Sequence, residues 1–106
     1  MEAIKNLYKT AHWEDAEGYF DGTMRSVLRD DENGKTILLK LPKGFYQTAH
    51  SHLTTEQHFV VEGEYEADGE VYEIGSYQIF KEHEEHGPFI SRNGALILVI
   101  WDPVKF

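Results

Sequence analysis

The sequence predicts an all-β fold, a sandwich or a barrel, in one domain of 106 residues. Short runs rich in β-branched and aromatic residues alternate with turn signals along most of the chain. Two of these turns are two-residue hairpin signals. A chain of this length has room for one domain with one real core. We expect an N-terminal extension, residues 1–22, that packs on a barrel formed by residues 23–106.

Seven runs are expected as strands: 23–28, 35–41, 56–62, 64–67, 70–74, 76–80 and 95–101. The first two flank the turn Asp31-Glu32-Asn33-Gly34, and the fourth and fifth flank Asp68-Gly69. Asn-Gly and Asp-Gly supply the positive φ angles that tight hairpins need. Only the start of the chain has helical spacing, where a strand would fit equally well; its apolar positions are Ile4, Leu7, Tyr8 and Ala11.

The two faces of the expected strands carry different side chains. In the run 56–62, Glu56, His58 and Val60 share one face, because successive side chains of a strand alternate. In the run 95–101 both faces are apolar, so neither suits contact with solvent. A single small barrel has only one interior. The extra apolar face therefore predicts a subunit interface, most simply that of a twofold homodimer.

Composition argues against several classes of function. Nineteen acidic residues against ten basic ones give a net charge of −9, which disfavours nucleic-acid and anionic-membrane partners. The absence of cysteine excludes disulfides, cysteine-ligated zinc, iron–sulfur clusters and thiol catalysis. No targeting segment is visible, and the longest apolar run is far shorter than the roughly 20 residues that span a bilayer. We therefore expect a cytoplasmic protein that acts on a small-molecule substrate.

Histidines are the distinctive feature, since five of the six lie between residues 50 and 86. His50 and His52 are two residues apart, so both imidazoles leave the same face of an extended strand. Glu56 follows at the start of the next run, and His86 comes thirty residues later. Imidazoles combined with a carboxylate suit a borderline divalent metal such as Fe, Mn, Ni, Zn or Cu. Four such ligands on an octahedral ion leave two positions for water, dioxygen or a chelating substrate.

One motif in this region identifies a family. The pattern Gly44-x5-His50-x-His52-x3-Glu56-x6-Gly63 resembles the first conserved motif of the cupin superfamily at every fixed position. From the composition of this chain, such a match is expected by chance in roughly 2 of 10,000 sequences. The match is therefore a strong signal.

The second cupin motif, G-x5-P-x-G-x2-H-x3-N, is only half kept. Gly75 and His86 stand at the right spacing, so the histidine ligand survives. Lys81, His83 and Ile90 occupy the positions of the proline, the second glycine and the asparagine. The loop geometry is therefore open to question, although histidine tolerates a left-handed backbone better than most residues do.

The resemblance covers roughly residues 23–102 and implies a double-stranded β-helix, the jelly-roll cupin barrel. It implies one divalent metal ion, Fe, Mn, Ni or Zn, whose ligands would be His50, His52, Glu56 and His86. The spacing between the last two is similar to that in the cupin domains of zinc-binding anti-sigma factors. It is also similar to that in small cupins related to acetylacetone-cleaving dioxygenases.

Other residues near the motif have two interpretations each. His58 shares a face with Glu56, and either forms an ordinary core hydrogen bond or orients the metal ligands. His83 lies either in a solvated loop or at the mouth of the pocket, as an acid–base group or alternate ligand. Four aromatic residues fit either the core or a pocket lining: Tyr46, Phe80, Phe89 and Trp101.

The resemblance favours a metal-dependent enzyme of the non-haem dioxygenase type. Its substrate would be a diketone, a phenolic ketone or an organic acid that binds the metal through two oxygens. The alternative is a non-catalytic metal or small-ligand sensor domain, as in the anti-sigma cupins. A sugar-binding or storage-type cupin would not need a complete ligand set.

Overall fold

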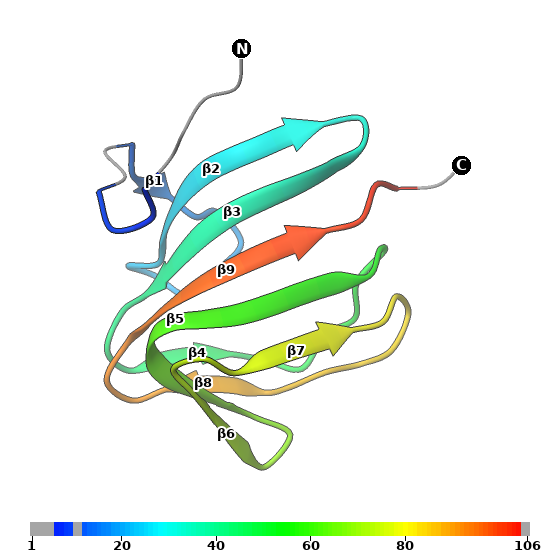
Figure 1. Ribbon diagram of the computed structural model, residues 1–106. Helices are drawn as coiled ribbons and strands as arrows, with labels where there is room; N and C mark the ends of the chain where they lie inside the picture. The colour runs from blue at the N-terminus through cyan, green and yellow to red at the C-terminus, as the bar shows by residue number, and fades with distance from the viewer. Residues whose placement is uncertain (1–5, 10–11, 105–106) are drawn as a thin grey trace.

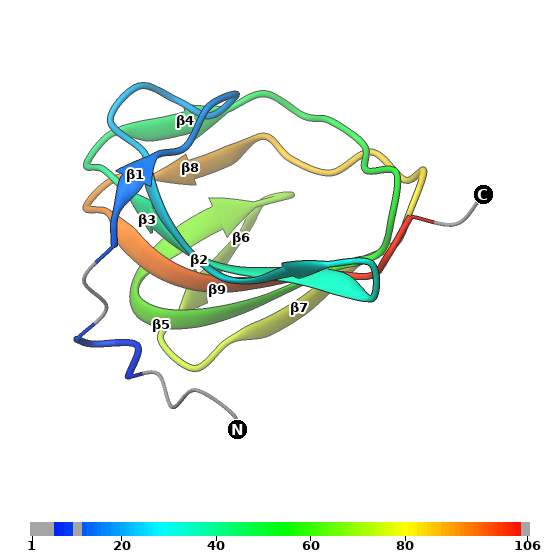
Figure 2. The same cartoon turned by 90° about the horizontal axis from the view of Figure 1, so that it is seen from above.

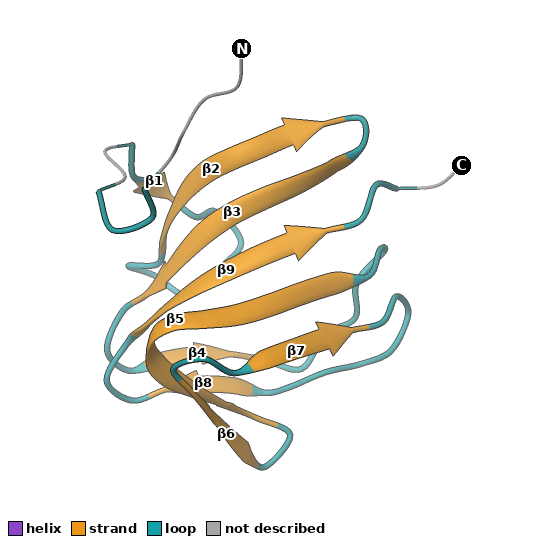
Figure 3. Ribbon diagram, in the orientation of Figure 1, coloured by secondary structure: helices purple, strands orange, loops and turns teal. Residues whose placement is uncertain are grey.

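The computed structural model describes residues 6–9 and 12–104, and all regular structure in those residues is β-strand (Figure 3). The all-β prediction is therefore confirmed. No described segment is a helix that would span a membrane. Ile4 and Ala11, half of the helical spacing expected at the start, lie outside the described residues, whereas Leu7 and Tyr8 form a turn. The strands are β1 (Glu14–Asp15), β2 (Met24–Asp31), β3 (Gly34–Leu41), β4 (Phe45–Gln47), β5 (Glu56–Ala67), β6 (Glu70–Glu73), β7 (Tyr77–Phe80), β8 (Phe89–Ser91) and β9 (Ala95–Trp101).

The strands form one antiparallel sheet in the order β1-β2-β3-β9-β5-β8-β4, with β6 and β7 also paired to β5 (Figure 1). β5 joins the two parts of the sheet. Its N-terminal part pairs with β9 and β7, and its last residues pair with β6 and β8. Seen from above, the sheet curls until β4 and β8 lie across the interior from the larger group of strands (Figure 2).

The bend of β5 occurs at Gly63, where the sequence had suggested a break between two strands. The φ angle of Gly63 is 72°, and a β-bulge shifts the pairing with β9 between Val60 and Glu62. A Cβ atom at Gly63 would collide with the backbone of Gly94 and Ala95. Glycine is therefore required here by both conformation and space, so the final residue of the motif serves to curl the sheet.

Both predicted hairpins are present. Asp68 and Gly69 have φ angles of 52° and 80°, the double positive pattern of the tightest two-residue turn. In the first hairpin the turn residues are Glu32 and Asn33, and Gly34 already pairs with Asp31. The connection therefore lies one residue earlier than Asn-Gly predicted.

The core lies on the concave side of the sheet, as the alternation in β5 predicted. Glu56, His58 and Val60 are buried there, whereas Phe59 on the opposite face is 42% exposed. From the expected N-terminal extension, Ala16 is buried in this core and Tyr19 packs against it. The interior thus combines a mostly apolar lining with a small number of polar side chains.

Candidate metal centre

Backbone pairing brings His50 and His86 together. Each donates its backbone N–H to the carbonyl oxygen of the other, at 2.9 and 2.8 Å, in an isolated antiparallel bridge. Residues directly opposite in such a pair project their side chains to the same face. The backbone N–H of His83 also donates to the carbonyl oxygen of His52 at 2.9 Å. These bonds fasten the loop before β5 to the loop before β8.

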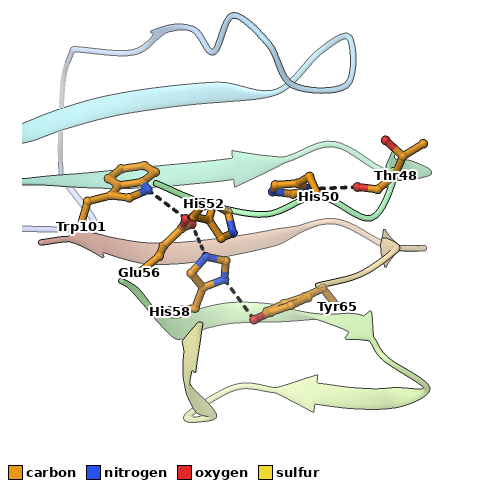
Figure 4. Close-up of polar contacts among 7 residues, drawn as sticks. All are labelled: Thr48, His50, His52, Glu56, His58, Tyr65 and Trp101. Carbon is orange, nitrogen blue, oxygen red and sulfur yellow. Dashed lines mark hydrogen bonds and ion pairs between the residues drawn. The ribbon is translucent and has the colours of Figure 1, made fainter. Parts of the chain in front are cut away.

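Glu56, the first residue of β5, points its carboxylate at three hydrogen-bond donors (Figure 4). Its Oε1 accepts from Nε2 of His58 at 2.6 Å. Its Oε2 accepts from Nδ1 of His52 at 2.8 Å and from Nε1 of Trp101 at 2.9 Å. Glu56 is only 3% exposed, and a carboxylate buried to that extent requires such partners.

The ionisation of Glu56 follows from these contacts. Burial by itself would raise the pKa of the carboxyl, but hydrogen bonds from His52 and His58 lower its pKa to about 2. Glu56 is therefore a carboxylate at neutral pH, and an ionised carboxylate only accepts hydrogen bonds. The nitrogens of His52 and His58 that face it consequently carry protons.

A further set of hydrogen bonds supports His58 on the side of its ring that faces away from Glu56. Nδ1 of His58 lies 3.1 Å from the hydroxyl of Tyr65, which donates to Oε1 of Gln78 at 3.2 Å. Nε2 of Gln78 donates to the hydroxyl of Tyr72 at 2.8 Å. Burial raises the pKa of Tyr65, as does negative charge at Tyr72 and Glu56, so its hydroxyl stays protonated. We call the connected residues the carboxylate network: Glu56, His58, Tyr65, Gln78, Tyr72 and Trp101.

The ring nitrogens of His50, His52 and His86 are candidate metal ligands. Nδ1 of His50 donates to the carbonyl oxygen of Thr48 at 2.9 Å, which leaves Nε2 as the lone-pair nitrogen of the neutral ring. Nε2 of His52 and Nε2 of His86 are buried without a hydrogen-bond partner. The nearest carboxylate to His86, that of Glu84, lies 3.9 Å away, beyond hydrogen-bonding distance. Buried ring nitrogens of this kind are what a bound metal would satisfy.

Two of the three ring pairs lie at distances that two ligands of one ion can have. With metal–nitrogen bonds of about 2.0–2.1 Å, two ligating rings have centroids about 4.5 Å apart at right angles and about 6.4 Å apart on opposite sides. The centroid of His52 lies 4.6 Å from that of His50 and 6.3 Å from that of His86. As they stand, no three His, Asp or Glu side chains among the described residues are arranged to hold a metal. Binding would therefore require these side chains to move closer to a common point.

The cavity beside the histidines is small. Its volume is about 30 Å³, room for about one water molecule or ion, and it is lined by Tyr19, Leu39, Leu41, Phe45, Gln47, His50, His52, Glu56, His58, Tyr65, Phe89 and Ile97. A second, more open groove of about 480 Å³ lies outside, between the β2–β3 turn, the loop 51–54 and the segment 101–104. His52 lines both spaces and so stands between them.

The other sequence candidates have distinct surroundings. His83 is exposed and has a φ angle of 64°, so histidine does adopt the left-handed conformation of the motif glycine it replaces. Phe80 is fully buried, and its ring packs against the rings of His52, His58 and His86. Phe89 lines the cavity, whereas Tyr46 is largely exposed. No sequence pattern indicated that Tyr65, Gln78 and Tyr72 belong to the site.

A family model described as the ChrR cupin-like domain matches residues 3–105, nearly the whole chain. The chain belongs to this cupin family. The resemblance carried by the histidine motif is thereby confirmed. No protein with a curated description matches this cupin significantly.

Solved structures confirm the jelly-roll fold of this cupin. It aligns with an RmlC-like cupin from Shewanella frigidimarina at 24% identity and a TM-score of 0.79, over 99% of this chain and 94% of the other. An acetylacetone dioxygenase from Acinetobacter johnsonii aligns at 16% identity and a TM-score of 0.78, over 96% and 74%. The Rhodobacter sphaeroides complex of SigE with the anti-sigma ChrR aligns at 22% identity and a TM-score of 0.74, over 89% and 51%. The present chain thus spans about half the length of that relative.

Proposed function

We propose that this cupin binds one divalent metal ion, Fe, Mn, Ni or Zn, through the four motif residues His50, His52, Glu56 and His86. The observation that supports this most is the pair of buried ring nitrogens, Nε2 of His52 and Nε2 of His86, that have no hydrogen-bond partner. Glu56, which the cupin motif gives as the fourth ligand, lies beside them. With no cysteine in the chain, nitrogen and oxygen atoms must supply the ligands.

A divalent ion at this position supplies Lewis acidity and open positions for the oxygen atoms of a substrate. The protein itself orients the rings. The carbonyl oxygen of Thr48 accepts from Nδ1 of His50, which leaves Nε2 of that ring for the ion, and the carboxylate of Glu56 lies 2.8 Å from Nδ1 of His52. Phe80 packs against the rings and excludes water from behind them.

As an enzyme, the protein would act as a non-haem dioxygenase on a diketone, a phenolic ketone or an organic acid. Two observations support this proposal. The fold is similar to that of an acetylacetone dioxygenase. The outer groove of about 480 Å³, which His52 borders, lies within the usual size range of ligand pockets.

The second candidate function is a metal or small-ligand sensor domain. The inner cavity of about 30 Å³ favours it, because that volume admits about one water molecule or ion and no diketone. The family description, a ChrR cupin-like domain, points the same way.

Metal analysis of protein purified without added metal separates the two functions. Iron together with oxygen uptake on diketones supports the dioxygenase, and tightly bound zinc without oxygen uptake supports the sensor. His52→Ala should lose the metal, with His12→Ala as a matched control, because His12 is exposed and lies outside the motif. Unchanged metal content in His52→Ala would contradict the assigned site.

We also propose that the protein is a cytoplasmic homodimer without nucleic-acid or membrane partners. The convex face of the sheet supports the dimer, since Phe59, Tyr77 and Ile79 are exposed on neighbouring strands. The net charge of −9 supports the absence of nucleic-acid and anionic-membrane partners.

A further inference from the structure

We propose that Tyr19 selects the ligand of the inner cavity, the space of about 30 Å³ beside the histidines. Its hydroxyl donates a hydrogen bond to an oxygen atom of a small carboxylate, and its ring limits the size of the molecule that can enter. The inference rests on the proposed metal-binding function, because the carboxylate of Glu56 would repel an anion from a metal-free cavity. It adds a ligand-binding residue outside the cupin motif, in the N-terminal extension.

Tyr19 lies at the opening of the inner cavity. Most residues that line the cavity are buried, and the partly exposed ones are Tyr19, Gln47, His50 and His52. A residue that borders the cavity and is also partly exposed to solvent lies where the two spaces meet. The opening is therefore between these side chains, and a molecule that enters the cavity passes beside Tyr19.

The loop between β1 and β2, which crosses beside β4 in Figure 2, holds Tyr19 in place. The backbone N–H of Tyr19 donates to the carbonyl oxygen of Ala16 at 3.3 Å, and Ala16 is buried in the core. The backbone N–H of Thr23 donates to the carbonyl oxygen of Phe20 at 3.1 Å. The ring of Phe20 packs against the ring of Phe45 on β4, with centroids 5.9 Å apart. Tyr19 is thus anchored by its neighbours in the loop and not by its hydroxyl.

The hydroxyl of Tyr19 makes no hydrogen bond within the part of the chain that the structure describes. The other phenol on the cavity wall, that of Tyr65, donates to Gln78. Both ring nitrogens of His58 have partners, and Nδ1 of His50 donates to a backbone carbonyl oxygen. A polar group beside a cavity that has no partner and does not anchor its own residue indicates a place for a ligand atom.

The surroundings of the Tyr19 hydroxyl favour a negatively charged oxygen acceptor. Burial raises the pKa of Tyr19, as does negative charge at Glu56, so the hydroxyl keeps its proton and acts as a donor. Positive charge at Arg25 has the opposite effect on this pKa, so a guanidinium also lies near the hydroxyl. Arg25 pairs with Leu39, a cavity residue, and the two side chains therefore share one face of the sheet. A carboxylate oxygen suits both groups, because it accepts hydrogen bonds and is attracted by Arg25.

The volume of the cavity limits the size of the ligand. About 30 Å³ holds roughly one water molecule or ion, so an ion would leave no further room inside. The rest of a ligand bound to that ion would lie in the opening, next to the ring of Tyr19. Formate, the smallest carboxylate, fits this arrangement. A carboxylate on an aromatic ring, such as benzoate, would need the space that the ring of Tyr19 fills.

Formate binding to the Co²⁺-loaded protein tests the role of the hydroxyl. The visible absorption of Co²⁺ changes when an oxygen ligand binds to the ion, so a titration gives the formate affinity of wild type, Y19F and Y46F. We expect Y19F to bind formate at least about 10-fold more weakly, because it loses a hydrogen bond to a charged group. Y46F is the matched control, since Tyr46 is 46% exposed and does not line the cavity. Equal formate affinity of Y19F and wild type, or an equal loss in Y46F, would overturn the inference.

Benzoate binding to Y19A tests the role of the ring. Removing the ring widens the opening, so Y19A should bind benzoate at least about 10-fold more tightly than wild type does. Unchanged benzoate affinity in Y19A would contradict the size limit. Circular dichroism of each metal-free variant checks that it is folded, and Y19F should unfold in urea at the same concentration as wild type, because its hydroxyl has no partner to lose.

The same titrations separate the inference from the proposed function. A wild-type protein that takes up no Co²⁺ would overturn the proposed function and the inference with it. A wild-type protein that takes up Co²⁺ but does not bind formate would overturn the inference alone.

Discussion

Strands β5 and β7 are joined by two tyrosine–glutamine hydrogen bonds, one on each face of the sheet. On the concave face the hydroxyl of Tyr65 donates to Gln78 at 3.2 Å, and Tyr65 is 2% exposed. On the convex face the hydroxyl of Tyr77 donates to Gln57 at 2.7 Å, and Tyr77 is 58% exposed. The chemical groups are the same, but their surroundings are opposite.

From this difference we expect burial, more than the donor–acceptor distance, to decide how much such a hydrogen bond contributes to the free energy of unfolding. The convex bond is shorter, yet water can replace either of its partners at little cost. The concave bond is longer, but a partner lost there leaves a polar atom without water. The concave bond also links to Glu56 through His58, so its loss affects the candidate metal centre.

The largest loss of stability is expected when the carboxylate network on the concave face loses its central residue, Glu56. Glu56→Ala leaves the buried donors of His52, His58 and Trp101 without their acceptor, so the free energy of unfolding should fall by about 3–5 kcal/mol. Gln57→Ala, the neighbouring change on the convex face, should alter it by about 0.5 kcal/mol or less. Urea unfolding of the metal-free proteins measures both. Similar losses in the two variants would remove the distinction between the faces.

Lowering the pH should reduce the stability that the Glu56 carboxylate contributes on the concave face. The pKa of Glu56 is lowered in the folded state from about 4.5 to about 2, so the unfolded state takes up this proton first as the pH falls. The contribution of the carboxylate is therefore complete above about pH 4.5 and is lost as the pH approaches about 2. A difference of this size corresponds to about 3 kcal/mol. Unfolding measured across this range should show a steeper loss for wild type than for Glu56→Gln, and equal slopes would contradict the prediction.

Substituting each of the two tyrosines should give a smaller difference in unfolding free energy, again with the larger loss on the concave face. Tyr65→Phe removes the partner of both Gln78 and His58 and should cost about 1–3 kcal/mol in unfolding free energy. Tyr77→Phe should change it by about 0.5 kcal/mol or less. Thermal or urea unfolding of the two variants, which differ from wild type by one oxygen atom each, tests the comparison.

The convex face should affect association more than stability. If this face forms the proposed dimer, Ile79→Lys should shift the sedimenting species from a dimer to a monomer, because it places a charge among exposed apolar residues. The unfolding free energy of the monomer should change by about 0.5 kcal/mol or less. A wild-type protein that sediments as a monomer of 12.3 kDa at micromolar concentration would rule out the dimer.

The sequence was informative where local rules hold. Strict alternation in the first half of β5 placed Glu56 and His58 on the concave face, as the structure confirms. The bulge between Val60 and Glu62 then reverses the alternation, so that Tyr65 joins the same face. Alternation alone would have placed Tyr65 outside. Only Gly63 hinted at the irregularity, and a glycine does not say how far the register shifts.

The orientation of the Glu56 side chain could not be predicted from local sequence patterns. Its direction depends on Trp101, which is far away in the sequence, and on His58, which Tyr65 and Gln78 hold in turn. The motif indicates that Glu56 reaches the site, but it does not specify which of several donors the carboxylate meets. The short strands β4 and β8 were also missed, because three residues give too little pattern to recognise.

The backbone bridge between His50 and His86 would link the proposed metal binding to the folding of the whole barrel. β5, β6 and β7 all lie in the stretch of chain between these two residues, so the bridge forms only after that long loop has closed. Closing this loop costs conformational entropy, and the loop is closed only in the folded state. An ion that binds both histidines therefore selects the closed barrel over the open chain, and it stabilises the fold in proportion to the logarithm of its concentration. The availability of the metal would then set the fraction of molecules that are folded.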